Sequence, residues 1–245
     1  LCRRMGVPYR HLCQAHLDNY YYFSHDSYAL NYSLVNNYEK ICNVDYKPFM
    51  LEQGPVADIA FKPGFLKQFE LANILFSAIG RSLRRLRLHL LRDEGRYGNY
   101  VLDSVMNLLR GRKDLRKMAS ARYVTPFENI SNEAFFYFPL QTEPEATLQI
   151  QSPEFFSQLW ALALCAKAMP SDTYLAVKEH VYVIGRRPRD FYDQIVAFKN
   201  VALLSIMLRG IEVIKKCKAV VTINGSSGYE AAMMGIPVII LCKRC

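Results

Sequence analysis

Short apolar runs alternate with segments of helical periodicity through the second half of the chain. The apolar runs predict strands at residues 134–140, 173–178, 201–204, 219–223 and 237–241. Helical periodicity predicts helices at residues 153–167, 188–196, 211–217 and 227–234. Because strands that alternate with helices are typical of parallel βαβ units, we expect a doubly wound α/β sheet over residues 131–245.

The first predicted helix of this region is opened by Pro153, a residue favoured at the first helical position. Its large apolar side chains repeat at helical spacing, which predicts that one face packs against the core. The residues of this face are Phe156, Leu159, Trp160, Ala163 and Leu164.

Residues 1–130 are less regular and rich in Tyr, Asn and Arg. Residues 65–91 have the pattern of one long helix, or of two helices broken near Gly80, and residues 100–117 have that of another. We therefore expect a partial, helix-rich N-terminal lobe (residues 1–130) and a Rossmann-like C-terminal lobe (residues 131–245). The pattern starts within a motif at residues 6–8 and ends directly behind a strand, so we expect both lobes to continue beyond this sequence.

The composition is that of a globular protein, with 51% hydrophobic and 22% charged residues and no low-complexity tract. The formal charge of +9 favours anionic partners, among them nucleic acid, a membrane surface and phosphorylated small molecules. Basic side chains crowd residues 81–92, a helical segment that is either solvated or rests on an anionic membrane. The sequence contains no run of eighteen apolar residues and therefore predicts no membrane-spanning helix. The seven cysteines are scattered, and Cys242 and Cys245 are separated only by Lys and Arg at the very end of the sequence. Their spacings predict no zinc site and are typical of a reduced, cytoplasmic protein.

Polar residues follow the strands, at the edge where an open parallel sheet binds its ligands. Behind the strand at 219–223 come Asn224, Gly225, Ser226 and Ser227, with Glu230 one helical turn further on. Glycine allows a ligand close to the backbone, and a helix N-terminus with two hydroxyls favours a phosphate. Ser227 and Glu230 also have the spacing of a capping box, which needs no ligand.

A second cluster follows the strand at 173–178. Lys178 and His180 point the same way if the strand persists to its end. Arg186 and Arg187 stand directly before the next helix, and guanidinium groups bind phosphate or carboxylate in bidentate fashion. The alternative is a solvated basic loop in which His180 only ends the strand.

A third cluster follows the strand at 134–140 and contains Gln141, Glu143 and Glu145. A carboxylate at this place is suited to hold a sugar hydroxyl or to act as a base, although the segment is equally compatible with a polar turn. We expect the three clusters to meet along one sheet edge and to bind an anionic donor together.

The order and spacing of these segments resemble the capsule polysaccharide biosynthesis family of glycosyltransferases, which includes enzymes similar to Kdo transferases. The resembling segments are residues 138–146, 177–180, 185–192, 219–232 and 235–238. The resemblance implies a GT-B fold in which this C-terminal lobe holds the donor nucleotide and the other lobe holds the acceptor. Related transferases usually have a proline, which stiffens the loop that presents His180, where this chain has Val181.

The resemblance implies a cytoplasmic glycosyltransferase of capsular or surface polysaccharide synthesis that transfers a sugar such as Kdo from CMP-Kdo. The implied partners are a CMP- or UDP-linked donor and a glycan or glycolipid acceptor. Apart from the resemblance, the basic segment at residues 81–92 leaves open a peripheral contact with an anionic membrane, and no nucleic-acid partner is expected. His180, Ser226 and Ser227 would bind the donor phosphate, with Arg186 or Arg187 in support. We expect no cofactor and no metal, since no Asp-x-Asp motif occurs.

Three alternatives remain open. One is a nucleotide-sugar epimerase of the same fold, and another is an inactive, truncated relative. The third is a basic nucleic-acid-binding module, against which stands the lack of a recognisable RNA- or DNA-binding pattern.

Overall fold

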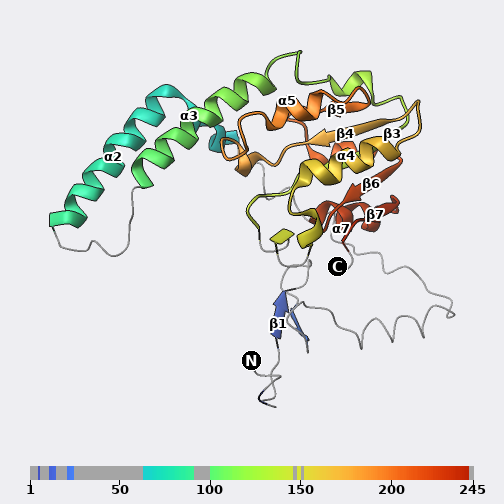
Figure 1. The fold of residues 1–245 in the computed structure, drawn as a ribbon, viewed down its shortest axis with the longest axis horizontal. Coiled ribbons are helices and arrows are strands. Elements are labelled where there is room, and N and C mark those ends of the chain that lie inside the picture. The colour runs from blue at the N-terminus through green and yellow to red at the C-terminus, as the bar shows by residue number, and fades with distance from the viewer. Residues whose placement is uncertain are drawn as a thin grey trace.

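Five parallel strands in the order β5-β4-β3-β6-β7 form the central sheet of the computed structural model (Figure 1). The structure describes residues 5, 63–90, 100–145, 148–149 and 152–242, and the backbone of residues 11–14 and 21–24. The strands are β3 (Phe135–Pro139), β4 (Tyr174–Lys178), β5 (Val201–Leu203), β6 (Ala219–Thr222) and β7 (Val238–Ile240). Each strand lies within a run predicted from the sequence, and the parallel pairing confirms the expected α/β class.

Helices cover both faces of this sheet (Figure 1). They are α4 (Gln158–Ala168), α5 (Phe191–Val196), α6 (Gly210–Ile214) and α7 (Ser226–Met233). Side chains of α4 and α5 share one core with Phe138, whereas α6 and α7 share a second core with Phe135 and Tyr137. Successive residues of β3 thus point into opposite cores, as the pleat of a strand requires.

A pair of long helices precedes the sheet. The 3-10 helix η2 (Pro63–Phe69) leads into α2 (Leu71–Leu90), which runs without a break through Gly80, and α3 (Tyr100–Met118) follows. Figure 1 shows α2 and α3 side by side, projecting from the sheet and its helices. The buried residues that join this pair to the first core are Phe69, Ile74, Leu108 and Met118.

Some predictions for the first half lie outside the described residues, namely those on residues 6–8 and on the end of the basic segment at 91–92. The backbone of β1 (His11–Gln14) pairs with that of β2 (Tyr21–Ser24) in antiparallel fashion. The division into lobes at residue 130 stays a prediction. Among the described residues no helix combines the length and the apolar character that a membrane span requires. Cys165 and Cys217 are buried free thiols, but Cys242 is disulfide-bonded, so the expectation of reduced cysteines is wrong at that residue.

The helix predicted at residues 153–167 differs from expectation in extent and in orientation. A 3-10 turn, η6 (Pro153–Phe155), stands apart from α4, which begins at Gln158. The buried residues of α4 are Gln158, Ala161, Leu162, Cys165 and Ala166. Phe156, Trp160 and Leu164, which were expected to face the core, are 69%, 58% and 42% exposed.

Glycines bring α3 against the loop that follows β4. Gly185 has a φ of +83°, and a Cβ at this residue would collide with the carbonyl oxygen of Asn107 and lie 2.8 Å from the backbone nitrogen of Gly111. A Cβ at Gly111 would in turn collide with the ring of Phe69. The N–H of Gly185 donates to Asp114 Oδ2 at 3.1 Å. The helix pair therefore meets the sheet region at a contact that leaves no room for a side chain.

Candidate functional site

The carboxyl ends of β3, β4 and β6 open into a cleft of two adjoining hollows. The hollows have volumes of about 200 Å³ and about 160 Å³. Both are lined by Pro139, Leu140, His180, Ser226 and Ser227. The first hollow is also lined by Gln141, Thr142, Glu145, Asn224 and Gly225, and the second by Lys178, Arg209 and Glu230 among others. Three loops that are far apart in the sequence thus meet at one edge of the sheet, while ligand binding by these residues stays a prediction.

Helix α7 begins at this cleft without a side-chain cap. Gly225 is its N-cap residue, and no side chain makes a capping hydrogen bond. Ser227 is already the second residue of the helix, so the capping box with Glu230 that the sequence allowed is not formed. The uncapped end of a helix carries a partial positive charge and backbone N–H groups, and it therefore favours an anion.

Gln141 joins the loop after β3 to the loop after β6. The residue is 7% exposed, and in the orientation that satisfies its amide, the oxygen accepts from the N–H groups of Gly225 (2.7 Å) and Asn224 (2.9 Å). The amide nitrogen then donates to Asn224 Oδ1 at 2.8 Å. A Cβ on Gly225 would lie 3.0 Å from this amide, which explains why glycine is suited to the turn. The polar atoms of Gln141 are thus used to join the two loops, and its role as a sugar ligand stays a prediction.

His180 lies half-buried between the two hollows. Its ring is tilted against that of Tyr182, with 5.6 Å between the ring centroids, and its Nδ1 is buried without a hydrogen-bond partner. Burial lowers the pKa of His180, with Lys178 and Arg187 acting in the same direction against the attraction of Glu179. The imidazole is therefore neutral near pH 7 and contributes hydrogen bonding to the cleft rather than charge. A 3-10 turn, η7 (Val181–Val183), follows it directly.

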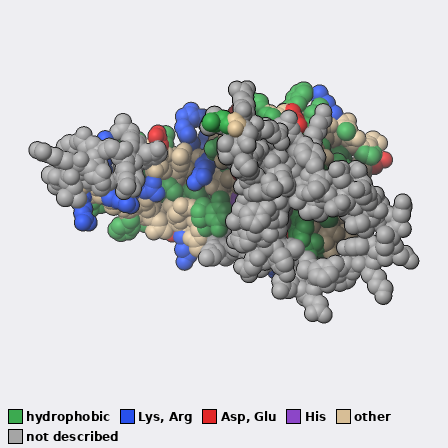
Figure 2. Space-filling view, turned by 90° about the horizontal axis from the view of Figure 1, so that it is seen from below, with side chains coloured by type: hydrophobic (Ala, Val, Ile, Leu, Met, Phe, Trp, Pro, Cys, Tyr) green, Lys and Arg blue, Asp and Glu red, His purple; other side chains and the backbone are tan. Residues whose placement is uncertain are grey.

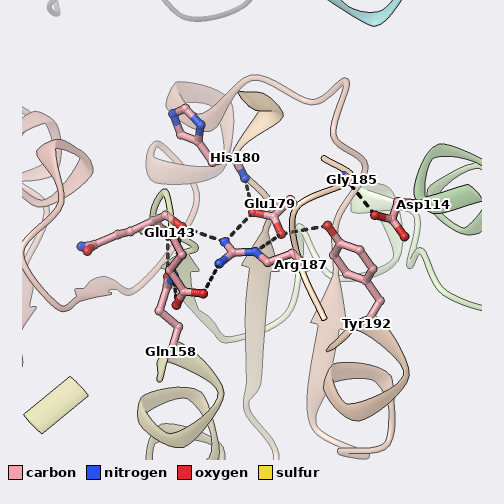
Figure 3. Close-up of polar contacts among 9 residues, drawn as sticks. Asp114, Glu143, Gln158, Glu179, His180, Gly185, Arg187 and Tyr192 are labelled. Atoms are coloured by element: carbon pink, nitrogen blue, oxygen red, sulfur yellow. Dashed lines mark hydrogen bonds and ion pairs between the residues drawn. The ribbon is translucent and has the colours of Figure 1, made fainter. Parts of the chain in front are cut away.

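Arg187 is buried in a polar network beside the cleft (Figure 3). Its Nε and Nη2 donate to Glu179 Oε2 and Oε1, both at 2.9 Å, and Nη1 lies 2.8 Å from Glu143 Oε2. Nη2 also donates to the carbonyl oxygen of Gln141 at 2.7 Å. Because its side chain is 1% exposed and faces these carboxylates, Arg187 does not line the cleft. The prediction that it supports the donor phosphate is corrected: its role is to tie the loops together.

Arg186 is exposed, but it lies elsewhere. It lines a separate hollow with residues of η2, α2 and α3, including Phe69, Arg81 and Asn107. The two adjacent arginines thus leave the backbone in different directions, and neither contacts the cleft. The expectation that Arg186 would join His180 and Ser226 is therefore also corrected.

Of the two glutamates predicted to bind sugar, only Glu145 lines the cleft, where it is exposed. Glu143 is held by Arg187 and accepts a hydrogen bond from Gln158 Nε2 at 2.6 Å. Gln158 also accepts from the N–H of Gln141 (2.6 Å) and donates to its carbonyl oxygen (2.9 Å). Glu143 is thus a structural carboxylate of the network.

Three residues of this network were not singled out from the sequence: Glu179, Gln158 and Tyr192. The Tyr192 hydroxyl donates to Glu179 Oε2 at 3.0 Å, and the backbone N–H of His180 donates to Glu179 Oε1 at 2.7 Å. A signal for Glu179 was present, because strand alternation that puts Lys178 and His180 on one side puts Glu179 on the other. No comparable signal exists for Gln158 or Tyr192, whose partners come from distant loops.

Comparison with known proteins identifies a family that matches this sequence. The model of the family described as "Capsule polysaccharide biosynthesis protein" matches residues 94–244. A solved structure, described as Thermosulfurimonas dismutans KpsC, beta Kdo 2,7 transferase, is similar with 19% sequence identity and a TM-score of 0.39. The similarity covers 64% of this chain and 45% of that one, so this chain spans less than half of that structure.

No curated protein matches the chain. The family model, however, covers more than half of the sequence and includes every strand of the parallel sheet and both hollows of the cleft. The chain belongs to the capsule polysaccharide biosynthesis protein family.

Proposed function

We propose that this chain is a glycosyltransferase of bacterial capsular or surface polysaccharide synthesis, and that its cleft binds a nucleotide-sugar donor. Membership of the capsule family supports polysaccharide synthesis as the process. The observation that carries donor binding is the uncapped N-terminus of α7, which shares a cleft with His180 and Lys178.

The phosphate of the donor lies against the first turn of α7 in this proposal. Backbone N–H groups and the hydroxyls of Ser226 and Ser227 donate to its oxygens, and so does the neutral imidazole of His180, which lines the same hollow. Lys178 and Arg209 line the second hollow and add positive charge to it. Transfer breaks the bond between the anomeric carbon and a phosphate oxygen, which leaves additional negative charge on the nucleotide. The helix terminus and these cations stabilise that charge without requiring a metal ion.

The sugar of the donor has two carboxylates near it in this arrangement. Glu145 is exposed at the first hollow and Glu230 is half-buried at the second, so both are candidates to accept hydrogen bonds from sugar hydroxyls. We favour CMP-Kdo as the donor because of the sequence resemblance, and a growing glycan or glycolipid as the acceptor.

A nucleotide-binding experiment tests the proposal. The melting temperature of the chain is measured with CMP, UDP and GDP, and we expect one of them to raise it, because a ligand that binds only the folded state stabilises it. His180→Ala and Ser226→Ala should each weaken the preferred nucleotide by roughly tenfold, the loss of one hydrogen bond to a charged group. Ser171→Ala is the matched control, since Ser171 is exposed in the turn before β4, at the other end of the sheet.

Two results would decide against the proposal. Unchanged affinity in both cleft variants would show that a nucleotide binds elsewhere. Conversion of a UDP-sugar in the absence of any acceptor would identify an epimerase in place of a transferase.

A further inference from the structure

Helix α2 turns an apolar face outward. Six large side chains on this helix are 51% to 73% exposed: Leu71, Leu75, Phe76, Ile79, Leu83 and Leu86. At about 100° of rotation per residue they fall within an arc of about 140°. The buried Ile74 lies outside this arc, on the side that packs against the rest of the molecule. The apolar face of α2 is therefore the one that its own fold does not use.

The charge of α2 has a single sign. No Asp or Glu occurs between Leu71 and Leu90, whereas the exposed side chains include Arg81, Arg84, Arg85 and Arg87. On the helix surface Arg85 falls at one margin of the apolar arc and Arg87 at the other. Arginines at such margins lay their aliphatic stems along an apolar surface and keep their guanidinium groups in a polar layer.

The helix pair stands out from the sheet region, which makes this face accessible to a large surface. Figure 1 shows α2 and α3 extending to one side, and Figure 2 shows Lys and Arg side chains together with hydrophobic ones over that projecting part. Contiguous exposed apolar patches beyond a few hundred Å² mark contact sites rather than ordinary protein surface.

We propose that α2 docks this protein on a membrane surface that carries anionic lipid, with its apolar face in the boundary between headgroups and acyl chains. A wide apolar arc with arginines at both margins and no acidic residue is the pattern of a helix that lies in such an interface. The negative charge of the lipid layer attracts the arginines, whereas a neutral partner would not. A protein partner needs complementary charges that fix how it docks, but α2 has no alternation of positive and negative charge. A fluid lipid layer needs no such match.

This inference does not rest on the proposed function. Helix α2 lies before residue 94, where the family match begins, so docking would be a property of this chain's own helix. Nucleotide binding and vesicle binding can therefore fail independently of each other.

Vesicle flotation of the full chain tests the proposal. We expect the protein to float with vesicles that contain phosphatidylglycerol, to stay behind with pure phosphatidylcholine, and to be released by high salt. Phe76→Asp should lower the vesicle-bound fraction by about tenfold or more, because an exposed aromatic ring that would enter the lipid layer is replaced by a charge. Phe156→Asp is its matched control, since Phe156 is 69% exposed and Phe76 73%, and it should bind as the parent does.

A second pair of variants tests the charge. Arg87→Glu should lower binding to anionic vesicles by roughly tenfold, whereas Lys218→Glu, an exposed residue just before β6, should change it little. Circular dichroism and melting curves establish whether each variant folds. If Phe76→Asp does not fold, the comparison of Arg87→Glu with Lys218→Glu tests the proposal in its place.

Three outcomes would overturn the proposal. The first is absence of binding to anionic vesicles by the parent chain, and the second is equal binding to neutral ones. The third is self-association, seen by sedimentation velocity and abolished by Phe76→Asp, because it would show that a second copy covers this face.

Discussion

Glu179 and Arg187 form a doubly hydrogen-bonded ion pair that is closed to solvent. The two N–O distances are both 2.9 Å, and the side chains are 0% and 1% exposed. Through Gln141, Glu143 and Tyr192 the same pair reaches the loop after β3 and helix α5. The walls of the cleft are therefore held in place by a buried charge pair.

Removal of Arg187 should cost a large part of the stability. We expect Arg187→Met to lower the free energy of unfolding by about 3–5 kcal/mol, because Glu179 is left as an unpaired buried charge. Arg186→Met, at the exposed neighbouring residue, should change it by less than about 0.5 kcal/mol. Urea unfolding of the two variants measures the difference, and equal losses would contradict the assignment of Arg187 to the interior.

A rescue experiment separates charge from packing. Glu179→Gln introduced into the Arg187→Met variant removes the unpaired charge, so the double variant should be more stable than Arg187→Met alone. A double variant that is less stable would show that the hydrogen bonds from Tyr192 and from the N–H of His180 stabilise the Glu179 carboxylate without Arg187.

The strands could be predicted because each apolar run is short and bounded by turn residues. The orientation of α4 could not be predicted, because its residues are apolar on all sides and their periodicity identifies no buried face. Gln158 faces inward since its amide pairs with both backbone groups of Gln141, a residue 17 positions earlier. A hydrogen bond between distant loops leaves no trace in local periodicity.

The cleft itself could be predicted in part, for a similar reason. His180, Ser226 and Asn224 meet at one edge because strand ends in a parallel sheet do so by geometry. Arg186 and Arg187 are loop residues, whose directions depend on what packs beside them. A buried Glu179 draws one of them inward, and only the tertiary structure shows this.

His180 should make stability depend on pH. Burial holds its folded-state pKa below the ordinary value of 6.5, so the unfolded chain takes up the proton first and the folded state is weakened as pH falls through about 6.5. His180→Gln removes this group, and we expect its unfolding midpoint in urea to fall less between pH 8 and pH 5 than that of the parent. A parallel decline in both proteins would show that His180 is not protonated differently in the two states.

Asp114 should act in the opposite direction. Burial raises its pKa from 3.8 to about 6, so the folded state keeps a proton that the unfolded chain has lost, and stability declines as pH rises from about 4 to about 6. Asp114→Asn avoids ionisation and keeps an acceptor for the N–H of Gly185, so it should stabilise the protein at pH 8 by about 1–2 kcal/mol and have little effect below pH 4. Asp103→Asn, at an exposed residue of the same helix, is the control for loss of a negative charge. A gain that is equal at both pH values would contradict this account.

Two glycine substitutions should have opposite signs. Gly185→Ala places a Cβ against the carbonyl oxygen of Asn107 in a backbone with a φ of +83°, so we expect a loss of 2 kcal/mol or more, since about 1–2 kcal/mol comes from the left-handed conformation alone. Gly80→Ala lies in the exposed middle of α2 with nothing within 4 Å of the added Cβ, and it should stabilise the protein by about 0.5–1 kcal/mol because alanine favours the helix. Thermal and urea unfolding of both variants measure these changes. If Gly185→Ala melted with the parent, α3 would not be packed against the loop after β4, and the contact that joins the helix pair to the sheet region would have to lie elsewhere.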